Sequence, residues 1–152
     1  MPRTITLDLP DLAATHALAA RLAALLRAGD AVLLEGPLGA GKSELARAVL
    51  RAAACDPGLE VPSPTFTLVQ SYDLPAGPAH HFDLYRLDGP EGLVELGWDE
   101  AREGIVLVEW AERLGAERPV DALTITLAPL ADEDARRATL SGWGDRMGAL
   151  AA

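Results

Sequence analysis

Apolar and polar residues follow one another along this chain in two periods, one typical of strands and one typical of helices. Residues 5–9 alternate, which predicts a short, half-buried strand. Two later runs, 31–34 and 104–108, are continuously apolar, as expected for central strands of a parallel sheet that is covered on both faces. Leucines at helical spacing predict a helix over 12–27, with Asp11 as its N-cap.

The rest of the pattern predicts further strands and short helices. A helix is expected from residue 44 to about residue 55, where Asp-Pro-Gly ends it. Two β-rich segments, 65–73 and 80–87, flank a turn at 75–78 and predict an antiparallel hairpin whose register is left open. The remaining elements expected are helical turns over 90–96 and 98–103, antiparallel strands over 122–127 and 137–140, and a weakly structured tail from residue 144.

Composition narrows the class of protein. A chain of 152 residues is expected to form one domain over 1–152 with a buried core. No apolar run approaches the roughly 20 residues that span a bilayer, and no leader pattern is visible, so a cytoplasmic location without membrane contact is expected. A formal net charge of −10 disfavours extensive direct binding of nucleic acid. The single cysteine, Cys55, excludes a multi-cysteine zinc site and is expected to pack in a helix.

Residues 36–43, Gly-Pro-Leu-Gly-Ala-Gly-Lys-Ser, carry the strongest chemical signal, because they match the phosphate-binding loop pattern without a substitution. An apolar strand leads into this loop and a helix-forming segment leads out of it. Glycines allow backbone N–H groups to surround a phosphate at a helix N-terminus, Lys42 can reach the outer phosphates, and Ser43 can bind magnesium. The loop residues expected to hold the nucleotide are Gly36, Leu38, Gly39, Ala40, Gly41, Lys42, Ser43 and Glu44.

The loop and the order of the elements predict the fold class and the place of the other site residues. We expect an α/β, P-loop NTPase-like three-layer sandwich with a mixed, mainly parallel central sheet and antiparallel hairpin strands. Such sheets bind ligands beyond the carboxyl ends of their strands. Glu109 directly follows the apolar run 104–108, and we expect it to share a magnesium ion with Ser43. Lys42 is the only lysine, so the Asn-Lys-x-Asp motif of GTPases is absent, which favours ATP.

Asp83 and Thr65 are weaker candidates from the pattern alone. Aspartate is unfavourable in the β-patterned segment 81–86, so either a role in phosphoryl transfer or an ordinary position is open for Asp83. Thr65, in a proline-rich loop, either senses the terminal phosphate as a switch residue or simply opens a strand. His80 and His81 lack neighbours that would complete a metal site, so both are expected at the surface or in packing.

Four blocks taken together resemble one family. The blocks are the loop at 36–43, Ser-Pro-Thr-Phe-Thr-Leu-Val at 63–69, His-Phe-Asp-Leu-Tyr-Arg-Leu at 81–87 and Leu-Val-Glu-Trp at 107–110. In order and spacing they are similar to the bacterial TsaE (YjeE) proteins. This resemblance implies an ATPase that supports formation of threonylcarbamoyladenosine (t6A) in tRNA together with TsaB and TsaD, while TsaC makes the threonylcarbamoyl-adenylate. The tRNA itself would be reached only through these partners.

The same resemblance implies roles for single residues. Ser43 and Glu109 match the magnesium-binding positions, and Lys42 matches the lysine of the phosphate loop. Asp83 matches an acid that is important for hydrolysis, Thr65 lies in the switch-like loop, and the segment 12–15 corresponds to the part of the family near the adenine.

Two other functions remain open on the sequence. A small-molecule P-loop kinase would need an acceptor pocket and an arginine-bearing lid, for which the candidates are Arg86, Arg102 and the pair Arg136 and Arg137. A nucleotide-gated adaptor would use ATP binding to order the proline-rich loop, with hydrolysis incidental.

Overall fold

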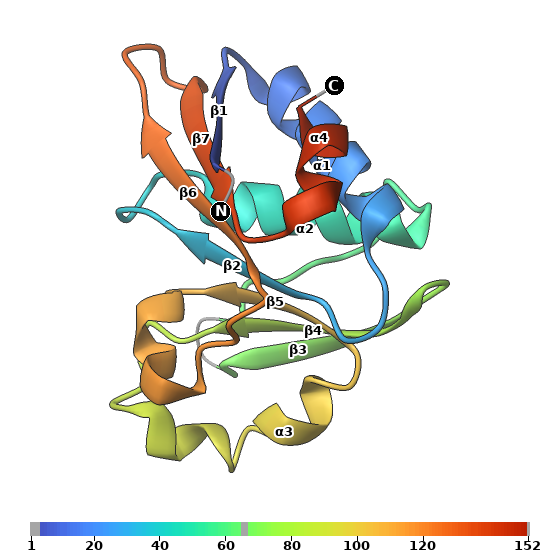
Figure 1. Cartoon of the computed structure of the whole chain (residues 1–152), viewed down its shortest axis with the longest axis vertical. Helices are drawn as coiled ribbons and strands as arrows, with labels where there is room; N and C mark the ends of the chain where they lie inside the picture. The colour runs from blue at the N-terminus through green and yellow to red at the C-terminus, as the bar shows by residue number, and fades with distance from the viewer. Residues whose placement is uncertain (1–3, 65–66, 152) are drawn as a thin grey trace.

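A single sheet runs through the protein in the computed structural model, which describes residues 4–64 and 67–151 (Figure 1). Within these residues the sheet has seven strands in the order β1-β7-β6-β2-β5-β4-β3. The strands are β1 Thr4–Leu9, β2 Ala31–Glu35, β3 Val69–Leu74, β4 Gly77–Asp83, β5 Ile105–Glu109, β6 Leu123–Pro129 and β7 Arg136–Ser141. The helices are α1 Leu12–Leu25, α2 Lys42–Ala54, α3 Trp98–Ala101 and α4 Met147–Leu150, with 3-10 turns η1 Pro90–Leu93, η2 Ala111–Glu117 and η3 Gly144–Arg146.

The centre of the sheet is parallel and its edges are antiparallel. Strands β6, β2, β5 and β4 run parallel to one another, whereas the pairs β1–β7, β7–β6 and β4–β3 are antiparallel. The two continuously apolar runs are the neighbouring strands β2 and β5, and every residue of β5 is buried. Because both faces of these strands are covered, their side chains need not alternate. The predicted fold class, a layered α/β sandwich around a mixed sheet, is confirmed.

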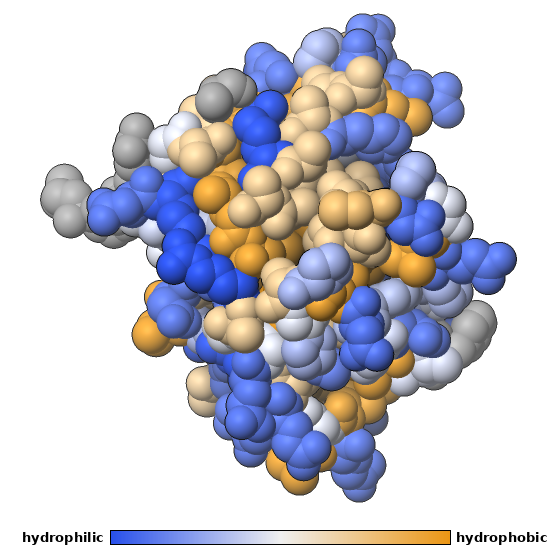
Figure 2. All heavy atoms as spheres, turned by 90° about the vertical axis from the view of Figure 1, so that its right-hand side faces the viewer, coloured by the Kyte–Doolittle hydropathy of each residue, from blue (hydrophilic) through white to orange (hydrophobic). Residues whose placement is uncertain are grey.

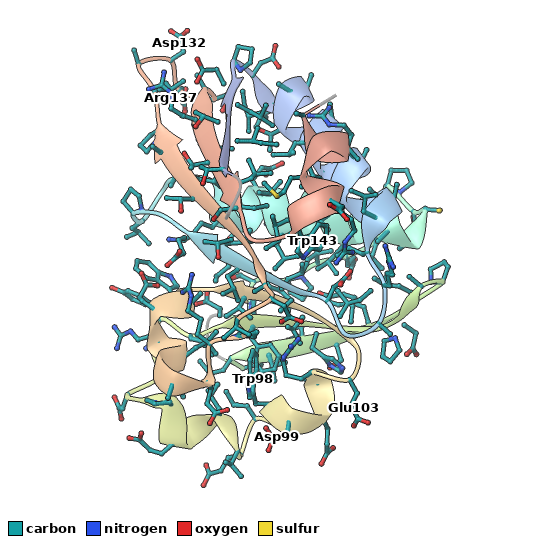
Figure 3. All side chains as sticks on the ribbon, in the orientation of Figure 1. Trp98, Asp99, Glu103, Asp132, Arg137 and Trp143 are labelled. Carbon is teal, nitrogen blue, oxygen red and sulfur yellow. The ribbon has the colours of Figure 1, made fainter. Side chains whose placement is uncertain are left out.

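Alternate side chains of the central strands face two different layers of helices. Leu34 belongs to the core beneath α1, α2 and α4. Its neighbour Leu33 belongs to the core beneath η1, α3 and η2. Figure 3 shows the same division, with Trp143 beside α4 and Trp98 beside α3 on opposite sides of the sheet. The parity of a residue along a central strand therefore decides which layer its side chain joins.

Helix α1 begins as predicted and ends two residues early. Asp11 is its N-cap, and Asp11 Oδ1 accepts the N–H of Ala14 at 2.9 Å. Figure 2 shows the side of the molecule that carries α1, where apolar residues gather in the middle of the face between hydrophilic ones. Alanines of a helix often lie at a surface in this way. In the part of the chain that the structure describes, no helix is long and apolar enough to cross a membrane.

The hairpin of β3 and β4 is displaced from the β-rich pattern, and its register is now set. Leu74 and Gly77 are partners, so the turn is only two residues long. Strand β4 ends at Asp83, because its Oδ1 accepts the N–H of Tyr85 at 3.1 Å and the chain turns out of the sheet there. The N–H of Asp83 donates to the carbonyl oxygen of Leu68 at 2.9 Å. The end of β4 is thereby held by the chain that precedes β3.

The expectation of a weakly structured tail from residue 144 is wrong. Helix α4 packs on the α1 layer, and the side chains of Met147 and Leu150 are fully buried. Arg21 Nε donates to the carbonyl oxygen of Leu150 at 3.0 Å. The guanidinium of Arg146 donates to both carboxylate oxygens of Asp30, at 2.8 and 2.9 Å. Buried apolar contacts and paired charges therefore order this segment, although Gly and Ala dominate its sequence.

Truncating Leu150 tests whether the C-terminal helix belongs to the folding unit. Leu150→Ala should lower the free energy of unfolding by about 2–3 kcal/mol, because it removes a fully buried side chain. Urea denaturation measures this change, and Val120→Ala, at a fully exposed valine, is the matched control with an expected change within about 0.5 kcal/mol. Equal stability of the two variants would show that α4 contributes nothing to the fold.

Candidate active site

The phosphate-binding loop joins β2 to α2 with the backbone geometry that its glycines permit. Gly41 is the N-cap of α2 with a φ of 101°, a conformation that residues with side chains rarely adopt. Gly36, with a φ of 142°, lies so close to the backbone of Leu127 in β6 that a Cβ there would collide with the Leu127 carbonyl oxygen. The loop is therefore packed against the sheet, and the N-terminus of α2 is left to face a ligand.

The side chain of Lys42 lies inside the loop. Its Nζ donates to the carbonyl oxygens of Gly36 and of Pro37, the latter at 3.3 Å. The same ammonium lies 3.8 Å from the centre of the Trp110 ring, within the range of a cation–π contact. Trp110 thus covers the lysine on one side while it packs against the core, and its ring lies 4.8 Å from that of Tyr85.

Three carboxylates act on the Lys42 ammonium. Burial lowers the pKa of Lys42 from its ordinary value, since a charged amine loses hydration there. The negative charges of Glu109, Glu112 and Asp83 oppose this shift. The site thus places one buried ammonium group close to three carboxylates. The net charge around Lys42 is therefore negative, although the phosphate loop alone contributes only the positive lysine.

Asp83 and Glu109 lie side by side at the carboxyl ends of neighbouring parallel strands. Asp83 is the last residue of β4 and Glu109 the last residue of β5, and the two are partners in the register of the sheet. Both are buried, with 5% and 2% of their surfaces exposed. The expected position of Glu109 at the strand end next to the phosphate loop is confirmed. Asp83, for which the pattern alone gave no decision, is brought to the same edge.

Both oxygens of the Glu109 carboxylate have a hydrogen-bond partner. Ser43 Oγ, in the first turn of α2, donates to Oε1 at 2.8 Å. The Nε2 atom of His81, in β4, lies 2.6 Å from Oε2. Because an ionised carboxylate can only accept, the hydrogen of this bond is on Nε2. A buried acid is thus held between the phosphate loop and the neighbouring strand.

The donor set fits magnesium better than a transition metal. The described residues contain no group of three or more His, Cys, Asp or Glu side chains that could hold a metal ion by themselves. Ser43 and Glu109 instead offer one hydroxyl and one carboxylate oxygen within hydrogen-bond distance of each other. Magnesium prefers such hard oxygen ligands and completes its shell with water and phosphate oxygens.

A cavity of ≈ 380 Å³ opens above these residues and brings most of the predicted site together. Its lining comprises Leu38, Gly39, Gly41, Lys42, Ser43, Glu44, Asp83, Tyr85, Glu109 and Trp110. Gly36 and Ala40, the other predicted loop residues, are not among the lining residues, and Ala40 is fully buried beneath the loop. Thr65 lies outside the described residues, so its switch role stays a prediction.

A larger cavity of ≈ 500 Å³ lies along α2, from Glu44 in its first turn to the residues after its C-terminus, and shares only Glu44 with the lining of the ≈ 380 Å³ cavity. It contains no glycine of the phosphate loop and neither of the strand-end acids, so the chemistry belongs to the smaller cavity. Cys55 lines the larger one. The expectation that Cys55 packs in a helix is wrong, because it is exposed as the C-cap of α2 with a φ of 55°.

His81 contacts the candidate site, although the sequence pattern gave it no role there. Its burial agrees with the expectation of a packing histidine, and its ring also lies within hydrogen-bond distance of Glu109. Its neighbour His80 lies on the other face of β4, where it hydrogen-bonds Ser71 at 2.8 Å. A signal was present in the sequence, since His81 and Asp83 are two residues apart and share a face of the strand.

Known proteins resemble this chain over most of its length. The family model of "Threonylcarbamoyl adenosine biosynthesis protein TsaE" matches residues 9–138. The tRNA threonylcarbamoyladenosine biosynthesis protein TsaE of Rickettsia felis is 43% identical over 99 residues, which cover 64% of this chain and 57% of that protein, little more than half its length. The Nostoc sp. protein of the same name is 36% identical over 138 residues, or 88% of this chain and 83% of that protein. The crystal structure of Bacillus subtilis YdiB superposes with a TM-score of 0.76 at 30% identity, covering 99% of this chain and 93% of the other.

Proposed function

The chain belongs to the TsaE family, and on this basis and the geometry of the site we propose that it binds and hydrolyses ATP with Mg²⁺ in support of t6A formation in tRNA. The observation that carries the proposal is the direct contact of Ser43, in the phosphate loop, with Glu109, at the end of the adjacent strand. A hydroxyl and a carboxylate in this arrangement are the protein ligands that a magnesium–nucleotide complex requires.

Each part of the loop has a role in binding the polyphosphate. The N–H groups at the N-terminus of α2 donate to phosphate oxygens and add the positive end of the helix dipole. Lys42 exchanges its carbonyl partners in the loop for phosphate oxygens, and its ammonium balances charge that develops on the transferred phosphoryl group. Trp110 shields this ammonium from water on one side.

The acids around Lys42 support a requirement for Mg²⁺. A polyphosphate that enters the cavity without a cation meets the charges of Asp83, Glu109 and Glu112, and one lysine does not offset them. When bound, Mg²⁺ neutralises phosphate charge and orients the terminal phosphate. Glu109 and Ser43 would hold it, and Asp83, the register partner of Glu109 at the same strand edge, would orient the attacking water or a water of the metal shell.

The base of the nucleotide is expected on the other side of the loop. Leu12 and Thr15, at the start of α1, lie beside Gly41 and Glu44 of the phosphate loop and α2. These residues lie in the segment for which the family resemblance implies proximity to adenine. ATP bound in this way would run from the acids of the ≈ 380 Å³ cavity, across the N-terminus of α2, to the start of α1.

The partners we propose are proteins of the TsaB and TsaD type, which would bring the tRNA. With a formal net charge of −10, the chain is unsuited to binding tRNA extensively by itself. A small-molecule kinase is less well supported, because none of the described residues lining the ≈ 380 Å³ cavity is an arginine. Among the candidate lid residues, Arg137 is paired with Asp8 at 2.8 Å near the outer end of the β6–β7 hairpin (Figure 3).

The Glu109 assignment predicts a separation of binding from turnover. Glu109→Gln should bind ATP in the absence of metal at least as well as the unaltered protein, because it removes a negative charge that repels the polyphosphate. It should nevertheless lose at least about 100-fold in Mg²⁺-dependent hydrolysis, since a metal contributes several kcal/mol to the transition state. Phosphate release and calorimetry measure the two quantities. Glu103→Gln, an exposed carboxylate near α3 (Figure 3), is the matched control. Unchanged turnover in Glu109→Gln would reject Glu109 as a metal ligand.

The biological role is tested by reconstituting t6A formation from purified TsaB-, TsaC- and TsaD-type proteins and tRNA. Adding this chain with ATP should allow repeated rounds of modification, and Glu109→Gln should not replace it. A nucleotide-gated adaptor would instead support modification in the hydrolysis-deficient form, and a kinase would leave the yield of t6A unchanged. Modified nucleoside is quantified by mass spectrometry after digestion of the tRNA.

A further inference from the structure

We propose that His81 is a positioning residue for the metal site, because it holds the Glu109 carboxylate in the orientation that presents one oxygen to Ser43 and to Mg²⁺. This inference rests on the proposed function, because it gives His81 a task only if Glu109 binds a metal ion. It adds a residue from β4 that acts through Glu109 and does not itself touch the nucleotide or the metal.

The two oxygens of Glu109 have different hydrogen-bond partners. Oε1 accepts from Ser43 Oγ at 2.8 Å, whereas Oε2 accepts from His81 Nε2 at 2.6 Å. When Ser43 and Oε1 turn to a metal ion, the bond to Oε2 can remain in place. His81 therefore fixes the rotation of the carboxylate through the oxygen that faces away from the loop.

Among the described residues, the contact with Glu109 is the only hydrogen bond of the His81 side chain. The residue is 2% exposed, and its Nδ1 has no hydrogen-bond partner among the described residues. Burying a ring nitrogen without a partner is unfavourable, so packing alone would favour an apolar side chain. The single strong contact of the ring, to Glu109, accounts for the polar side chain.

The register of the sheet directs His81 toward the site. His81 and Asp83 are separated by two residues of β4, so both side chains lie on the face that α2 covers. On the neighbouring strand β5, Leu107 is the partner of His81 and Glu109 the partner of Asp83. The hydrogen bond between His81 and Glu109 therefore runs diagonally between the two strands.

Three substitutions separate positioning from packing. Glutamine places its amide nitrogen the same number of bonds from Cα as Nε2 of histidine, asparagine is one bond too short, and leucine has no donor. Binding of a non-hydrolysable ATP analogue is measured by calorimetry with EDTA and then as Mg²⁺ is titrated. We expect His81→Leu and His81→Asn to weaken the apparent Mg²⁺ affinity by about 10- to 100-fold and His81→Gln to restore it to within about threefold.

The controls decide between the possible outcomes. Affinity for the analogue in EDTA should be the same in all variants, and His80→Leu, next to His81 but on the opposite face, should bind Mg²⁺ like the unaltered protein. Thermal unfolding confirms that each variant is folded; if leucine prevents folding, the contrast between Gln and Asn decides. Equal Mg²⁺ affinity in all three variants, or a parallel loss of affinity in EDTA, would overturn the positioning role alone. If Mg²⁺ does not strengthen analogue binding to the unaltered protein, both this inference and the proposed function fail.

Discussion

The carboxylate of Glu109 is 2% exposed, so hydrogen bonds from its neighbours have to replace the water that it loses on burial. The candidate site is arranged around these hydrogen bonds. One oxygen is satisfied by the phosphate loop through Ser43 and the other by the neighbouring strand through His81. The contact is possible only because β2 and β5 are parallel neighbours, so that the loop after β2 and the end of β5 meet at one edge of the sheet. The two apolar strands are thus what places an acid next to a phosphate site.

The charges in this site suit a nucleotide that arrives with a divalent cation. Lys42 is buried and close to several acids, so the cavity by itself is not a general anion site. A chain of net charge −10 can still bind a nucleotide at such a loop, because salt screens the distant surface charges and does not screen the contacts inside the cavity to the same extent. A protein with this balance can use ATP while its partners handle the tRNA, which is the division of labour that we propose.

Local patterns predicted the parts of the structure that local interactions decide. The loop at 36–43, its flanking strand and helix, and the place of Glu109 follow from glycine content and continuous apolar runs. The role of His81 depends on the register of β4 against β5, which is a non-local pairing and left no trace beyond its spacing from Asp83. The C-terminal helix was missed because Met147 and Leu150 are its only large apolar residues, and tertiary packing orders them.

A crystal structure of the protein with Mg²⁺ and a non-hydrolysable ATP analogue would show whether Ser43 and Glu109 bind the metal ion. We predict Mg²⁺ with Ser43 Oγ as a ligand at about 2.1 Å and with Oε1 of Glu109 bound directly or through one water, while His81 Nε2 still donates to Oε2. A magnesium ion held elsewhere, with the hydrogen bond between Ser43 and Glu109 intact beside the bound analogue, would contradict it.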